Sequence, residues 1–155
     1  EKGFDLVDSG SAAGLDGSIA NAAERGLGWL GYYWAPTSIL GKYEMVQLDF
    51  EVPLDMAEFN ACTAVPDCAD PQPNAYPVAE VYTVVTKRLA EENPVAMAYL
   101  GKRAWSNEVV NGLLAWMDEN QATNEDAAWH FLETQPDLWK SWLEPEVAAK
   151  VEAAL

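Results

Sequence analysis

The spacing of apolar residues changes near Lys87, and this change constrains the fold more than any other feature of the chain. Before Lys87, short apolar or alternating runs are separated by glycine and proline, which is typical of strands and loops. After it, apolar residues recur every three or four positions, which is typical of helices. The sequence therefore predicts an α/β chain that is rich in helices towards its C-terminus.

Four strands are predicted in the first part. Two of them, Phe4–Val7 and Leu27–Trp34, flank a helix over Ala12–Arg25, and this order predicts a right-handed parallel βαβ unit. Tyr43–Phe50 alternates apolar and polar residues, so we expect a half-buried strand there. Val78–Thr86 is rich in β-branched residues and predicts the fourth strand.

The helices after Lys87 are delimited by local signals. Lys87–Glu92 ends before Asn93-Pro94, because a residue that precedes proline is driven away from helical angles. The remaining helix starts are expected at Pro94, Ser106, Thr123 (a capping box with Asp126) and Pro145.

A long loop over residues 52–77 holds five prolines and both cysteines, Cys62 and Cys68. Two cysteines are too few for a zinc site, and their spacing is too wide for a CxxC redox motif. A disulfide that closes a small loop is the natural prediction and would place the protein in an oxidising compartment. Two free thiols in a cytosolic loop are the alternative.

The charge excludes several classes of partner. The chain carries 9 Lys and Arg against 25 Asp and Glu, a net charge of -16. Such a chain repels nucleic acid and anionic lipid. No apolar run is long enough to span a membrane, and residues 1–4 lack the apolar stretch of a signal peptide, so we expect any signal to have lain upstream.

Catalytic patterns are weak, so we expect no enzyme, no cofactor and no metal site. The single histidine, His130, has Asp126 and Glu133 as its helical neighbours and is expected to be solvated. A hydrolase that uses Ser9 or Ser11 stays a distant alternative, because no second histidine exists to activate a serine.

Tryptophan is abundant, with seven residues in the chain. Five lie in the helical part and are expected to pack helices onto a sheet: Trp105, Trp116, Trp129, Trp139 and Trp142. Trp34 differs, because it ends a predicted strand before Ala35-Pro36, and ligands of open α/β sheets bind outside such strand ends. Ligand contact and core packing are both open for Trp34. In a regular strand Tyr33 would point to the opposite side.

Several segments resemble, in order, the C-terminal half of the periplasmic glycine betaine/proline betaine binding proteins of ABC importers. The segments are Gly31-Tyr32-Tyr33-Trp34-Ala35-Pro36, Tyr43-Glu44-Met45-Val46-Gln47-Leu48, Asn74-Ala75-Tyr76-Pro77-Val78, Lys87-Arg88-Leu89-Ala90-Glu91-Glu92-Asn93-Pro94 and Trp139-Lys140-Ser141-Trp142-Leu143. The similarity runs over nearly the whole chain from Phe4.

The resemblance implies part of a two-lobed type II periplasmic binding protein fold, with the solute held in a box of aromatic rings between the lobes. Residues 1–36 would belong to the second lobe, and residues 37–155 would return to the first lobe with its C-terminal helices. Because these proteins are about twice as long, we expect the N-terminal half to be absent from this chain. Thr37 and Ser38 stand where the family often has an aromatic residue or a histidine.

The function implied is that of a periplasmic receptor, not an enzyme. It would bind glycine betaine or a related quaternary ammonium solute through Trp34, with Tyr33 as a weaker candidate, and deliver it to the permease of an ABC importer. A π face suits this solute, because a trimethylammonium group donates no strong hydrogen bond. The alternative is a module that binds a partner protein through exposed tryptophans in the helical part.

Overall fold

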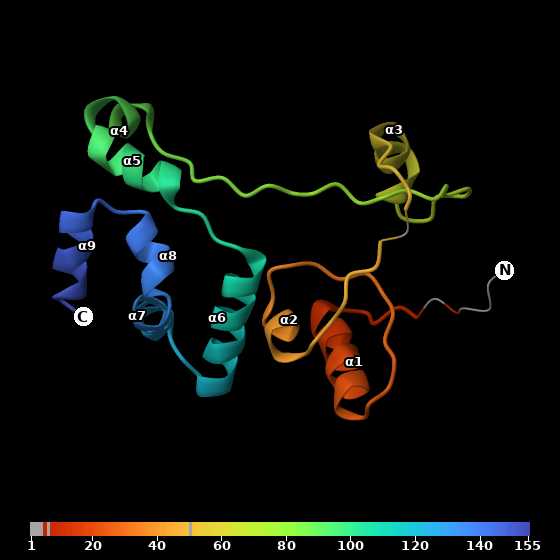
Figure 1. The fold of residues 1–155 in the computed structure, drawn as a ribbon. Coiled ribbons are helices and arrows are strands. Elements are labelled where there is room, and N and C mark those ends of the chain that lie inside the picture. The colour runs from red at the N-terminus through yellow and green to blue at the C-terminus, as the bar shows by residue number, and fades with distance from the viewer. Residues whose placement is uncertain (1–4, 6, 50) are drawn as a thin grey trace. The chain divides into compact units, whose positions relative to one another are not determined.

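The computed structural model describes residues 5, 7–49 and 51–155. The described part forms two units, one comprising the residues up to Met45 together with Arg88–Leu155, the other Val46–Lys87. Figure 1 shows the helices of both units. Their bounds are α1 Ala12–Glu24, α2 Ser38–Lys42, α3 Met56–Glu58, η1 Phe59–Thr63, α4 Lys87–Glu92, α5 Pro94–Lys102, α6 Asn107–Asn120, α7 Asn124–Thr134, α8 Pro136–Ser141 and α9 Pro145–Glu152.

The predicted helices are confirmed. The residues that predict their ends form capping hydrogen bonds or occupy the first turn, as the following examples show. At the start of α1 the Ser11 hydroxyl accepts from the Gly14 amide, and Gly26 follows the helix with a left-handed φ of 64°. In α7 the Thr123 and Asp126 side chains form the predicted capping box. Pro94 opens α5 at the predicted place.

Two short helices in the first unit were not predicted. Thr37 caps α2 through its hydroxyl, which accepts from the Leu40 amide at 3.4 Å. Pro136 occupies the first turn of α8, the position that proline favours. Both helices are short, so they leave no periodic apolar pattern in the sequence.

The largest buried cluster joins the C-terminal helices α7, α8 and α9. It contains Phe131, Trp139, Trp142 and Ala148. The Trp139 indole is 3% exposed, and its Nε1 donates to the Leu132 carbonyl at 2.8 Å. The polar edge of a buried indole is thus satisfied, as burial requires.

The prediction that all five tryptophans of the helical part are core residues is wrong for two of them. Trp129 is 47% exposed and Trp105 is 41% exposed. Trp105 lies at the edge of the buried cluster, with its ring centroid 4.4 Å from that of Phe131 and 5.3 Å from that of Trp142. No sheet is present among the described residues for these helices to cover.

The predicted strands are not confirmed. Residues 27–34, 44–49 and 77–86 have neither helical structure nor a strand ladder (Figure 1). A strand is stabilised by a ladder of backbone hydrogen bonds to a second segment, and no such ladder is present in the described part of the chain. The α/β class is therefore not confirmed by this structure. Phe4, Leu6 and Phe50, which belong to the first and third predicted strands, lie outside the described residues.

The second unit is a small turn-rich body closed by the predicted disulfide between Cys62 and Cys68, which is present. Asn74 links two parts of this unit, because its side chain accepts from the Asp55 amide and donates to the Asp55 carbonyl and to the Thr63 hydroxyl. Cys62 is buried. The loop predicted from its prolines and cysteines is thus organised by one covalent and three polar links.

Candidate functional site

Trp34 lies on the chain between α1 and α2, and its side chain is 45% exposed. The Tyr33 ring stacks on the Trp34 indole, with centroids 4.8 Å apart and planes inclined by 25°. The prediction that Tyr33 points to the opposite side is therefore wrong. It assumed a regular strand, whereas residues 27–34 form no strand.

Helix α1 holds Tyr33 by its phenol. The hydroxyl donates to Asp16 Oδ1 at 2.6 Å, across 17 positions of sequence. Burial raises the pKa of Tyr33, the bond to Asp16 raises it further, and a hydrogen bond with Thr37 acts in the opposite direction. The phenol therefore stays protonated and keeps donating at physiological pH. This bond fixes the ring that covers one side of Trp34.

Helix α6 holds the backbone on the other side of Trp34. The amide N–H of Thr37 donates to Asn111 Oδ1 at 2.7 Å, across 74 positions. The peptide bond between Ala35 and Pro36 is cis. Trp34 thus precedes a turn whose far end is held by a side chain of a distant helix.

This arrangement offers an accessible aromatic surface with a carboxylate close to it. An indole face attracts a cation within about 6 Å of the ring centroid, most strongly when the cation is desolvated. Asp16 adds negative charge beside the Tyr33 hydroxyl. Such a surface attracts an organic cation.

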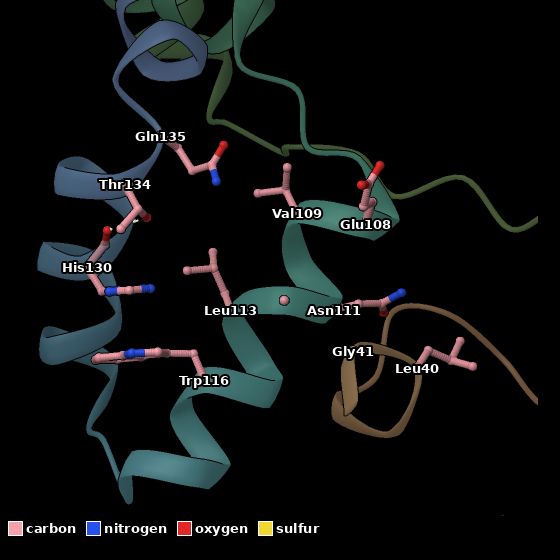
Figure 2. Close-up of a pocket in the computed structure, with 11 residues that line it drawn as sticks. Leu40, Gly41, Glu108, Val109, Asn111, Leu113, Trp116, His130, Thr134 and Gln135 are labelled. Atoms are coloured by element: carbon pink, nitrogen blue, oxygen red, sulfur yellow. Dashed lines mark hydrogen bonds between the residues drawn. The ribbon is translucent and has the colours of Figure 1, made fainter. Parts of the chain in front are cut away.

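A cavity of about 830 Å³ lies along the same helix, α6, where it faces α2 and α7 (Figure 2). The rings of Trp116 and His130 stack across the space between α6 and α7, with centroids 3.9 Å apart and planes within 5°. Val109 and Leu113 line the α6 side (Figure 2). The prediction of a solvated His130 is correct only in part, because the ring is half-buried and one face of it stacks on an indole.

The cavity and Trp34 are connected through Asn111. Asn111 lines the cavity and also accepts from the Thr37 amide. Trp34 itself does not line the cavity. We therefore regard the aromatic surface of Tyr33 and Trp34 as the candidate ligand site and α6 as its support. The sequence did not predict the roles of Asn111 and Asp16. An asparagine or aspartate on a helix gives no local sign that it will hydrogen-bond to a residue far away in the chain.

Residues 5, 7–49 and 51–155 contain no group of histidine, cysteine and carboxylate side chains that could hold a metal ion. The Ser11 hydroxyl accepts from the Gly14 amide at 3.0 Å and so serves as a helix cap. Within the same residues no helix is long and apolar enough to cross a bilayer.

Comparison with known proteins identifies the family. The model of one family, described as the substrate binding domain of ABC-type glycine betaine transport systems, matches residues 1–134. No curated protein and no solved structure matches the chain. Proteins of this family bind a solute outside the cytoplasm for an ABC importer and are in general not enzymes. The match covers most of the chain, and we conclude that this protein belongs to the family of substrate-binding domains of ABC-type glycine betaine transport systems.

Proposed function

We propose that this chain binds glycine betaine or a related quaternary ammonium solute against the indole of Trp34, with Tyr33 as part of the same wall. The observation that supports this most is an exposed indole backed by a stacked tyrosine, immediately before a turn that two helices hold in place. Aromatic side chains that lie together at a surface are typical of ligand-binding grooves.

The energetics favour a methylated cation as the ligand. Its charge is spread over methyl groups that donate no strong hydrogen bond, so π faces and nearby carboxylates are the groups that distinguish it from a neutral solute. A cation over an indole contributes up to about 2 kcal/mol when it is desolvated. Further aromatic walls would add to this, and we propose that a preceding N-terminal half of the receptor supplies them.

In the complete receptor, residues 1–36 would form part of one lobe and residues 37–155 part of the other. Closure of the lobes would desolvate the cation and present the loaded receptor to the permease of the importer. We propose the periplasm as the place of binding. The Cys62–Cys68 disulfide supports an oxidising compartment.

The test is calorimetric titration of the full-length receptor with glycine betaine, proline betaine and choline. We expect Trp34→Ala to weaken binding by roughly 10- to 30-fold, which is the equilibrium equivalent of about 1.4 to 2 kcal/mol. Trp129→Ala is the matched control, because it removes an indole of similar exposure, 47% against 45%. A receptor that binds none of the three solutes, or binds them equally well without Trp34, would contradict the proposal.

A second candidate is a module that binds a partner protein through the helical part. The exposure of Trp129 and Trp105 favours it, because large exposed aromatic side chains are enriched at protein interfaces. Capture of the permease by the Trp129→Ala variant, measured beside its solute titration, separates the two functions. If Trp129→Ala abolishes capture of the permease while solute binding is unchanged, both surfaces operate in one receptor.

A further inference from the structure

We propose that Asn111 on α6 is a positioning residue for solute binding, because it fixes the turn that carries Trp34. This inference rests on the proposed function of Trp34. Its geometric part, however, concerns only the contact between α6 and the turn and can be tested without any solute.

The contact is a single, well-directed hydrogen bond. The Thr37 amide lies just before α2, so no carbonyl of that helix can accept from it. A partly buried amide without an acceptor is costly, and Asn111 Oδ1 provides one at 2.7 Å. The bond therefore determines where the chain leaves the turn and enters α2.

Two more positions on the same face of α6 reinforce this contact. Asn111, Ala115 and Asp118 follow one another at spacings of four and three, which places them in one line on the helix. Asp118 pairs with Lys42 of α2 at 3.3 Å. Gly41 lies so close that a Cβ there would be 2.2 Å from the Asn111 carbonyl oxygen and 2.8 Å from the Ala115 Cβ.

Close backbone approach of this kind packs α2 directly against α6. Glycine at position 41 allows the two backbones to approach each other. The side-chain oxygen of Asn111 adds a contact to Thr37, the residue before α2. Trp34 is three residues before Thr37. The support from α6 therefore reaches the turn at its C-terminal side.

The turn is also held on its N-terminal side. Asp16 of α1 accepts from the Tyr33 hydroxyl, and Tyr33 stacks on Trp34. With both supports in place, the indole keeps one orientation before the solute arrives. Binding to a preorganised side chain does not require the side chain to lose conformational entropy. Loss of one support therefore weakens binding without removing any atom that touches the solute.

The first experiment needs no variant. Amide hydrogen exchange of Thr37, followed by NMR in the full-length receptor without solute, measures whether the amide is bonded. We expect exchange at least tenfold slower than the rate of an unstructured chain. Exchange at the unstructured rate would overturn the proposal directly.

The second experiment compares three variants of the full-length receptor. Asn111→Leu has a similar volume but no acceptor, whereas Asn111→Asp retains a side-chain oxygen for the Thr37 amide. Asn107→Ala, in the exposed first turn of α6, is the matched control. The readouts are the affinity for glycine betaine and the ¹⁹F resonance of 5-fluorotryptophan at Trp34, assigned by its loss in Trp34→Phe.

We expect Asn111→Leu to bind 5- to 20-fold more weakly and to shift or broaden the Trp34 resonance before solute is added. Asn111→Asp should restore both readouts to within twofold of the unmodified receptor, and Asn107→Ala should change neither. If Asn111→Leu leaves the resonance and the affinity unchanged, or if Asp fails to restore them, Asn111 does not position the turn. If the resonance shifts but Trp34→Ala binds solute normally, the support exists and the proposed function of Trp34 fails.

Discussion

The close approach of α2 to α6 yields the sharpest stability prediction. Replacement of Gly41 by alanine would place a Cβ 2.2 Å from the Asn111 carbonyl oxygen, about 1.2 Å inside the 3.4 Å at which ordinary contact begins. The obstacle is backbone, so it cannot rotate away, and α2 must move off α6. Overpacking of this kind costs roughly 1–3 kcal/mol.

Alanine also stabilises a helix by about 1 kcal/mol relative to glycine. This gain in stability must be separated from the loss caused by the clash. Gly112 provides the matched control, because it lies on α6 and a Cβ there would meet nothing within 4 Å. Gly112→Ala receives the same gain without the clash. The difference between the two variants therefore isolates the overpacking.

The assay is urea unfolding followed by far-ultraviolet circular dichroism. We expect Gly41→Ala to be less stable than Gly112→Ala by roughly 1–3 kcal/mol, with Gly112→Ala at or above the stability of the unmodified protein. Equal stability of the two variants would refute the reasoning, because it would mean that α2 does not lie against α6 at Gly41.

Three further predictions concern other parts of the chain. Trp139→Ala should lower the free energy of unfolding by roughly 3–5 kcal/mol in urea titrations, because it empties a buried site and leaves the Leu132 carbonyl without its donor; a loss under 1 kcal/mol would contradict the buried cluster. Opening the Cys62–Cys68 bond, which closes a loop of sequence separation 6, should destabilise the second unit by about 2 kcal/mol and speed its amide exchange in mass spectrometry, with α6 unaffected. The pKa of Asp118 lies below its ordinary 3.8, because Ser38 and Lys42 bond to the carboxylate. The ionised carboxylate therefore stabilises the fold above pH 3.8, and this stabilisation is lost as the pH falls through the lowered pKa. Asp118→Asn should lose less stability on acidification than the unmodified protein, and parallel pH profiles of the two proteins would refute this.

The helices could be predicted from the sequence because their ends are encoded within a few residues. The Thr123–Asp126 box and the proline of α5 act over one turn, and each is found where the pattern predicts it. The disulfide was predicted for the same reason, since its two cysteines are six positions apart. Thr37 carries an equally local capping signal for α2, but Pro36 directly before it favours a turn rather than a helix.

The strands could not be established from their own residues, because a ladder is a property of two segments. Val78–Thr86 has the composition of a strand, yet it joins no strand ladder among the described residues. The site shows the same limit. The position of Trp34 before Ala35-Pro36 indicates a candidate ligand contact from local sequence. The hydrogen bond between Thr37 and Asn111 spans 74 positions and could not be predicted from either segment alone. The family assignment came from the order of several motifs, and the family match confirms it.

The central claim is that the electron-rich face of the Trp34 indole binds a methylated cation. The most direct measurement replaces Trp34 in the full-length receptor with tryptophans that carry one, two, three and four ring fluorines, and determines the affinity for glycine betaine at each step. Fluorine withdraws charge from the ring face and weakens its attraction for a cation with little change of shape, so the account predicts that affinity falls with every added fluorine. An affinity that stays constant across the series would show that this indole face does not hold the cation.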